Sequence, residues 1–166
     1  MQYGDAIGVL RCLPLFSKLN PSKLKLLAFS STYLTFEAGE ELFQEGDPAD
    51  GAYIIDEGEV EVLTAVGGRQ ITVGRLQRQD LFGEMAIILN QPRTAKIRAA
   101  TPLKVLKIDA SVFLKLVTEN PDVALAVMRS LSDKIARVTE RYQHLESRLH
   151  AGPSSSGSAG SDSRTE

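Results

Sequence analysis

Glycine residues divide the stretch between residues 32 and 109 into short segments, and this spacing constrains the fold more than any other feature. The glycines stand at positions 39, 46, 51, 58, 67, 68, 74 and 83. Between them lie apolar or alternating runs such as Tyr53-Ile54-Ile55 and Val60-Glu61-Val62-Leu63. Turn residues at intervals of about eight to twelve positions, with such runs between them, are typical of an antiparallel sandwich or barrel. The pattern therefore predicts a mainly β region.

Helical patterns flank this β region on both sides. Asn20 is placed to cap a helix that begins at Pro21, and Ser111 and Asn120-Pro121 are placed to open two later helices. We expect strands at 33–36, 41–43, 53–55, 60–63, 70–73, 95–99 and 103–108, a hairpin loop at 65–69 and a short helix at 84–89. The predicted organisation is one domain, with a helical segment at 1–30, a β region at 31–110, helices at 111–149 and a flexible Ser/Gly-rich tail at 151–166.

The charge balance and the hydropathy pattern exclude several classes of protein. Lys and Arg number 19 and Asp and Glu number 21, so the net charge is −2 and the positive excess that binds nucleic acid is missing. No apolar run approaches the ~18 residues of a membrane span. The N-terminus also lacks the basic and apolar segments of a secretory signal, so we expect a cytoplasmic protein. The single cysteine, Cys12, is expected to be a small buried residue.

The sequence offers no arrangement of residues suited to catalysis or metal binding. Ser30, Ser31 and Ser130 have no His or Asp context that would activate a nucleophile. His144 and His150 are not spaced to share one face of a helix. We therefore expect neither an enzyme nor a metal site nor a cofactor.

The segment from Asp80 to Ala95 carries the strongest indication of function. Gly83 falls between a predicted strand and a helical turn, where a glycine lets a ligand approach the backbone closely. The amides of Glu84, Met85 and Ala86 would then be helix N-terminal donors that favour anions. Arg93 follows a loop and has the donor geometry that suits phosphate. The Glu84 carboxylate would repel phosphate, so a sugar hydroxyl is its expected partner.

This segment resembles the phosphate-binding cassette of cyclic nucleotide-binding domains. The family pattern is Phe-Gly-Glu-x-Ala, two or three apolar residues, a short loop and Pro-Arg-x-Ala. It is matched by Phe82, Gly83, Glu84, Ala86, Pro92, Arg93 and Ala95. The glycine-marked turns at 36–40, 44–47 and 52–60 are also similar, and the resemblance covers roughly residues 10–145.

The resemblance implies an eight-stranded antiparallel β-roll, jelly-roll-like, with N-terminal helices and a long C-terminal helix. It implies that Glu84 binds a ribose 2′-hydroxyl and that Arg93 binds the cyclic phosphate, aided by backbone amides of Gly83–Ala86. Thr94 is compatible with either cyclic AMP or cyclic GMP. The resemblance also suggests that the pocket is lined by Val73, Leu76 and Phe82, with Thr139 as the one hydroxyl residue near the base.

The last predicted helix carries an apolar seam with steps of three and four residues. Its members are Met128, Leu131, Ile135, Val138, Tyr142, Leu145 and Leu149. Three heptads of this kind, surrounded by charged residues, favour pairing with a second copy in a symmetric dimer. The alternative is that the stripe packs on the β-roll of its own chain.

Two functions follow from these observations and remain open. One is a sensor that binds cyclic AMP or cyclic GMP and repositions its terminal helices toward an unknown effector protein. The other is a ligand-independent structural or protein-interaction module with the same fold. The cassette keeps both Glu84 and Arg93, which favours the sensor. The chain shows no helix-turn-helix, kinase, channel or cyclase segment, so direct DNA binding is not expected.

Overall fold

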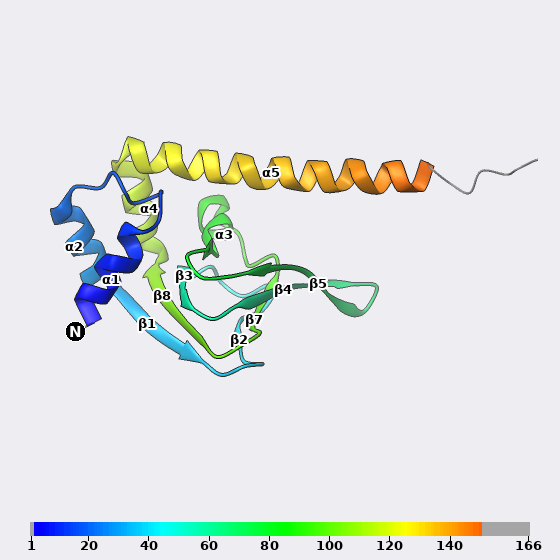
Figure 1. The fold of residues 1–166 in the computed structure, drawn as a ribbon, viewed down its shortest axis with the longest axis horizontal. Helices are drawn as coiled ribbons and strands as arrows, with labels where there is room; N and C mark the ends of the chain where they lie inside the picture. Colours follow the sequence, from blue (N-terminus) through cyan, green and yellow to red (C-terminus); the bar gives the residue numbers. More distant parts are fainter. Residues whose placement is uncertain (1, 151–166) are drawn as a thin grey trace, which may run out of the picture. The chain divides into compact units, whose positions relative to one another are not determined.

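The structure, a computed structural model, describes residues 2–150 (Figure 1). The helices are α1 (Gln2–Arg11), α2 (Pro21–Phe29), α3 (Glu84–Leu89), α4 (Ala110–Glu119) and α5 (Pro121–His150). The strands are β1 (Ser31–Phe36), β2 (Glu41–Phe43), β3 (Gly51–Glu57), β4 (Val60–Val66), β5 (Arg69–Leu76), β6 (Leu81–Phe82), β7 (Lys96–Ala99) and β8 (Leu103–Asp109). Residues up to Val127 form one compact unit, and α5 from Met128 onward belongs to a second unit. The expected tail at 151–166 lies outside the described residues.

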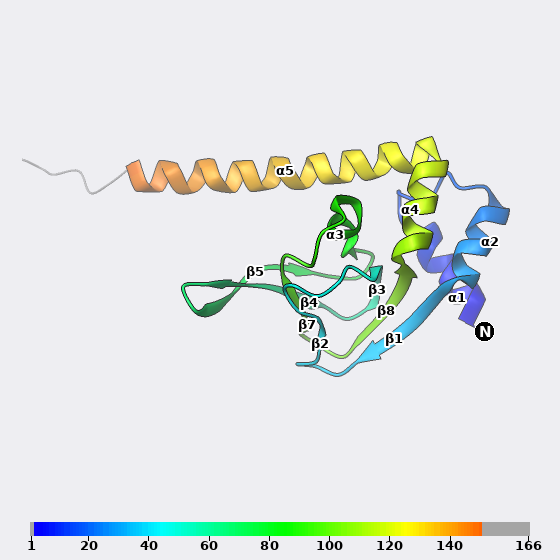
Figure 2. The same cartoon turned by 180° about the vertical axis from the view of Figure 1, so that it is seen from behind.

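Two four-stranded antiparallel sheets form the β region (Figure 2). One has the strand order β1-β8-β3-β6, and the other has the order β2-β7-β4-β5. Each of the seven predicted strand runs coincides with one of these strands, except that Ala95 lies just before β7, and the predicted mainly β roll with flanking helices and a long last helix is confirmed. The strand expected just before Gly83, for which no bounds were predicted, is the two-residue β6, which pairs with Tyr53 and Ile54 of β3.

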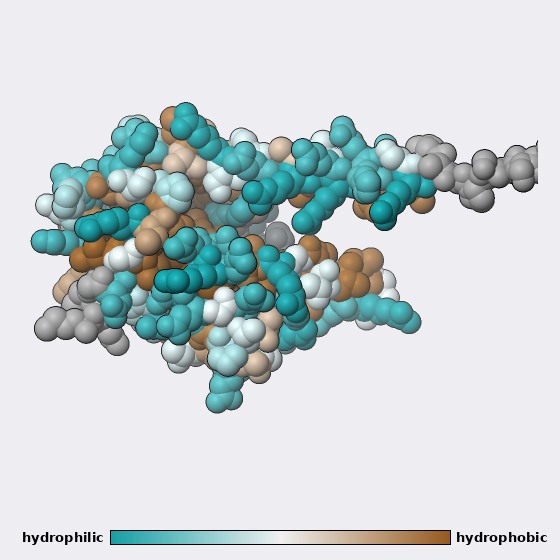
Figure 3. Space-filling view, in the orientation of Figure 1, coloured by the Kyte–Doolittle hydropathy of each residue, from teal (hydrophilic) through white to brown (hydrophobic). Residues whose placement is uncertain are grey.

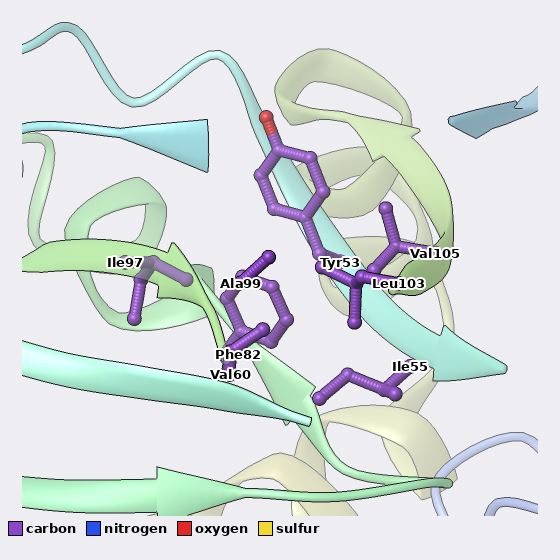
Figure 4. Close-up of a cluster of buried hydrophobic side chains, with 8 residues drawn as sticks. All are labelled: Tyr53, Ile55, Val60, Phe82, Ile97, Ala99, Leu103 and Val105. Carbon is purple, nitrogen blue, oxygen red and sulfur yellow. The ribbon is translucent and has the colours of Figure 1, made fainter. Parts of the chain in front are cut away.

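Apolar side chains from both sheets meet in the core of the roll (Figure 4). Tyr53 and Phe82 stack with ring centroids 5.2 Å apart. The other buried members of this cluster are Ile55, Val60, Ile97, Ala99, Leu103 and Val105. Because these residues come from five strands, burial of their apolar surface ties the two sheets together.

Local sequence signals set the element ends in several places. The Asn20 side chain accepts a 2.8 Å hydrogen bond from the amide of Ser22, so the predicted cap of α2 is confirmed. The β4–β5 hairpin turns at Gly67 and Gly68, which both have positive φ, as a two-residue turn of this kind requires.

Two expectations about single residues are wrong. The N-cap of α4 is Asp109 and not Ser111, because β8 runs directly into the helix. Cys12 is exposed. It directly follows the last residue of α1, where Leu10 and Leu13 on either side take the buried positions instead.

The seam on α5 is largely exposed within the chain. Leu131 is half-buried, and the other seam residues are exposed: Met128, Ile135, Val138, Tyr142, Leu145 and Leu149. Exposed apolar side chains also lie on the β4–β5 hairpin, at Val66, Ile71 and Val73 (Figure 3). Within residues 2–150, no helix has the length and apolar character to cross a bilayer.

Candidate functional site

Gly83 forms the junction between β6 and α3 and has a left-handed backbone, with φ of 83°. A Cβ atom at this position would lie 2.8 Å from Nη1 of Arg93 and 3.1 Å from the carbonyl oxygen of Gly51. Both the backbone conformation and the lack of space therefore require glycine. The cassette glycine is what allows Arg93 to lie directly against the start of α3.

The guanidinium of Arg93 is buried and fixed by backbone acceptors. Nη1 donates to the carbonyl of Gly83 at 2.6 Å, and Nη2 donates to the carbonyl of Gly51 at 2.6 Å. Nη2 also approaches Oδ1 of Asp50 at 3.3 Å. The Phe43 ring lies under the guanidinium, 4.1 Å from centroid to Cζ. Within the described chain, Nε of Arg93 is buried with no hydrogen-bond acceptor.

The backbone of Arg93 is held as firmly as its side chain. Its amide donates to the carbonyl of Asp47, and its carbonyl accepts from the amide of Gly46, both at 2.8 Å. The turn that carries these groups is closed by the carboxylate of Asp47, which accepts from the amide of Gln44 at 2.8 Å. The segment between β2 and β3 thus holds both the amide and the carbonyl of Arg93.

Asp50 connects Arg93 to strand β8. Its Oδ2 accepts from Nζ of Lys107 at 2.7 Å, and its Oδ1 accepts a long 3.4 Å bond from the hydroxyl of Tyr53. Burial acts to raise the pKa of Asp50, but the nearby Lys107 and Arg93 cations outweigh it and hold that pKa below its usual value. Burial acts to lower the pKa of Lys107, but the bond to Asp50 and the charges of Tyr53, Asp50 and Asp109 together outweigh it and raise that pKa.

Glu84 is the first residue of α3 and is buried. Among the described residues, Glu84 and Arg93 are the only charged side chains that are buried, each with 3% of its surface exposed. A buried charge is costly unless polar groups surround it, so two of them beside one glycine indicate a site that is built for polar contacts. The structure thus brings together, around Gly83, two residues predicted from the cassette.

The other predicted ligand-binding residues lie in different surroundings. Ala86 is buried in α3, and Met85 is half exposed, with 49% of its surface accessible. Thr94, which follows the arginine, is exposed.

The predicted pocket residues do not share one environment. Phe82 belongs to the core between the sheets, and Leu76 packs against that core. Val73 is exposed on β5. The hydroxyl of Thr139 on α5 donates to the carbonyl of Ile135, at 2.9 Å, within its own helix.

Sequence reasoning missed several residues that contact Arg93 or its partners, namely Phe43, Asp50, Gly51 and Lys107. They lie on β2, β3 and β8 or next to these strands, far from Arg93 in the chain. The only available signal was the carboxylate of Asp50, which stands three positions before the strand predicted at 53–55. Within residues 2–150, no group of His, Cys, Asp and Glu residues is arranged to hold a metal ion.

The site thus lies in an antiparallel β-roll in which a left-handed glycine junction seats a buried arginine. The family model described as the cyclic nucleotide-binding domain matches residues 33–120, which is more than half of the chain. The chain therefore belongs to the cyclic nucleotide-binding domain family.

The relatives of this chain include cAMP-dependent protein kinase regulatory subunits and a CRP-like cAMP-activated global transcriptional regulator of Mycobacterium tuberculosis. The chain is 36% identical over 104 residues to a cAMP-dependent protein kinase regulatory subunit of Emericella nidulans, a match that covers 63% of this chain and 25% of the relative. The chain thus spans about a quarter of the length of that subunit.

Solved structures show the same architecture. The regulatory domain of Toxoplasma gondii PKA, crystallised with cAMP, has a TM-score of 0.63 at 26% identity and covers 68% of this chain and 43% of that one. The sensor domain of the transcriptional regulator DNR from Pseudomonas aeruginosa has a TM-score of 0.73 at 22% identity. That match covers 83% of this chain and 93% of the sensor domain, and at this identity it supports the fold alone.

Proposed function

We propose that this protein is a regulatory sensor that binds cyclic AMP or cyclic GMP at the Gly83 junction. The observation that carries the proposal is the pair of buried charges, Glu84 and Arg93, on either side of the cassette loop. Family membership and the cAMP in the Toxoplasma regulatory domain support a cyclic nucleotide as the ligand.

Arg93 is the proposed phosphate-binding residue. Its two Nη groups are used to hold the side chain in place, whereas its Nε is a buried donor that lacks an acceptor among the described residues. A buried donor without a partner costs about 1–3 kcal/mol. A phosphate oxygen that accepts from this guanidinium removes that cost and adds a charge-assisted bond.

Glu84 is the proposed ribose-binding residue. A carboxylate accepts hydrogen bonds and repels phosphate, so the 2′-hydroxyl of the sugar is the donor that suits it. The start of α3 next to Gly83 contributes backbone amides, of which those at Met85 and Ala86 are the proposed phosphate donors. Thr94 is compatible with adenine or guanine, so the proposal covers both nucleotides.

The proposed output is a change in the terminal helices that an effector protein or a second copy detects. Ligand binding acts on such a change only through different affinities for two helix arrangements. The exposed seam on α5 supports a homodimer, since a three-heptad stripe of this kind is suited to pairing. We propose regulation rather than catalysis, in the cytoplasm.

One observation favours the alternative of a ligand-independent interaction module. The Nη groups of Arg93 already have acceptors at Gly83 and Gly51, so the arginine also serves to hold these two loops together. A direct binding measurement separates the two roles, because only a phosphate-binding arginine gives a protein that binds the cyclic nucleotide.

Isothermal titration with cyclic AMP and with cyclic GMP tests the proposal. We expect Arg93→Lys and Arg93→Ala to weaken binding by more than tenfold, which is roughly 1.4 kcal/mol or more. Glu84→Gln should reduce the preference for a ribose ligand over its 2′-deoxy analogue. Arg98→Ala is the matched control, because Arg98 pairs with Glu61 on the β2-β7-β4-β5 sheet and not with the groups around Gly83. If the wild-type protein binds neither nucleotide, the interaction module becomes the better account.

A further inference from the structure

Lys107 on β8 lies close to the site but outside the cassette. Strand pairing puts it directly opposite Tyr53 of β3. Its side chain runs over the backbone of Gly51, where an added Cβ would lie 2.8 Å from Cε and 3.1 Å from Cγ of Lys107. Its ammonium group then reaches Oδ2 of Asp50 at 2.7 Å. The lysine therefore packs against both of the residues that hold Nη2 of Arg93.

The Asp50 carboxylate contacts two cations, and it lies closer to one than to the other. Its contact with Lys107 is 2.7 Å, whereas its contact with Arg93 is 3.3 Å. The backbone carbonyl of Asp50 also accepts from the amide of Ala110 at 2.9 Å, so this residue cannot simply move away from the site. If Lys107 were neutral, Arg93 would be the one cation left to the carboxylate among the described residues, beside the long bond from the Tyr53 hydroxyl.

We infer that Lys107 is a positioning residue for Arg93: it binds the Asp50 carboxylate and so keeps the guanidinium available for an anionic ligand. This inference rests on the proposed function, because the anion concerned is the phosphate of the cyclic nucleotide. Without Lys107, the undivided charge of Asp50 competes with phosphate for Arg93 and also pulls Nη2 away from the Gly51 carbonyl.

A double-mutant cycle measures this coupling. Lys107→Met should weaken cyclic nucleotide binding by about three- to fivefold, the upper part of the range for a partly exposed ion pair. In an Asp50→Asn background the same change should alter affinity by less than about twofold, because the neutral amide no longer needs a second cation. Lys107→Arg should restore most of the loss.

Lys104→Met provides the matched control. Lys104 is also on β8 and also pairs with an aspartate of β3, Asp56, at 3.8 Å, and its ammonium lies over the ring of Tyr33 rather than near Arg93. Its replacement should leave affinity unchanged. An equal loss for Lys107→Met with and without Asp50 would overturn the inference, since the lysine would then act on the ligand directly. Unchanged affinity in Lys107→Met would overturn it as well.

A measurement on the ligand-free protein separates this inference from the proposed function. The side-chain Nε–H resonance of Arg93, assigned by its loss in Arg93→Lys, should shift in Lys107→Met and stay in place in Lys104→Met. If the wild-type protein binds neither nucleotide, the proposed function fails, and this resonance alone decides whether Lys107 positions Arg93. An unmoved resonance contradicts the inference.

Discussion

Arg93 shows how a charged side chain is accommodated inside a small β-roll. Its Nη groups donate to two backbone carbonyls, and an aromatic ring lies under its charge. The contact at Gly83 is possible because this residue has no Cβ, which would collide with Nη1 of Arg93, and the lack of a side chain at Gly51 makes room for Lys107 beside the same site. At the scale of the residue, the site therefore depends on the absence of side chains as much as on their presence.

The first residue-scale prediction concerns Gly83. Gly83→Ala should lower the free energy of unfolding by more than the roughly 1–2 kcal/mol cost of a left-handed alanine, because its Cβ would also collide with Nη1 of Arg93. Gly67→Ala is the control, since Gly67 has φ of 58° and nothing within 4 Å of an added Cβ. Urea denaturation of both variants compares them, and equal losses would refute the claim of a steric conflict at Gly83.

A second residue-scale prediction concerns Tyr33, which plays no part in the proposed site. Burial, assisted by the negative charges of Asp56 and Asp5, raises the pKa of Tyr33 to about 12 from 10.0. The unfolded chain then loses this proton before the folded chain does. The Tyr33 contribution to stability is therefore complete below pH 10 and is lost as the pH rises from 10 to 12.

Tyr33→Phe tests this linkage. The Tyr33 hydroxyl is buried with no hydrogen-bond partner among the described residues, so its removal at neutral pH should leave stability unchanged or raise it by up to about 1 kcal/mol. The variant should lose less stability than the wild type between pH 10 and pH 12 in denaturant titrations. An identical alkaline loss in both proteins would show that another group is responsible.

At the scale of the element, α5 differs from the other helices in what it leaves exposed. Its seam residues recur at the period of a coiled coil, yet most of them are accessible in the single chain. Apolar residues on one helix face contribute to stability only when another surface covers them. A second copy of α5 offers the same face with the same spacing.

The element-scale prediction is that a charge in the seam disrupts self-association. Ile135→Lys should reduce the mass in solution from about twice to once the chain mass of 18.1 kDa, measured by light scattering. Ala136→Lys adds the same charge one position away, outside the seam, and should leave the mass unchanged. A wild-type protein that is monomeric at every concentration would disprove the dimer.

At the scale of the whole molecule, the cassette joins distant parts of the chain. Segments between β2 and β3, the start of α3 and the end of β8 all contact Arg93 or its partners. A ligand that binds these groups in the folded state only should stabilise the fold as a unit.

The whole-molecule prediction is a ligand-dependent melting temperature. A cyclic nucleotide at 100 times its dissociation constant should add about 2.7 kcal/mol of stability, which raises the Tm by several degrees in a protein of this size. The shift should grow with ligand concentration and vanish in Arg93→Ala. A shift of the same size in that variant would place the ligand elsewhere.

Several features of this protein follow from short-range sequence signals. The helix start at Asn20-Pro21, the turn at Gly67-Gly68 and the nine-residue interval between Glu84 and Arg93 all act over a few residues or along one cassette. Such signals are readable because the backbone geometry that they demand depends on residue type alone. They were sufficient to predict the main strand runs and helices and to single out Glu84 and Arg93, whereas the burial of these two charges is seen only in the structure.

Other features depend on which strands pair, and the sequence alone does not predict this pairing. Pairing of β3 with β8 brings Lys107 to Asp50, residues that are far apart in sequence. Pairing of β6 with β3 puts Phe82 on Tyr53, so that it becomes a core residue rather than an open pocket wall. Local propensity carries no information about such neighbours, because a strand's register is set by the sheet that buries it.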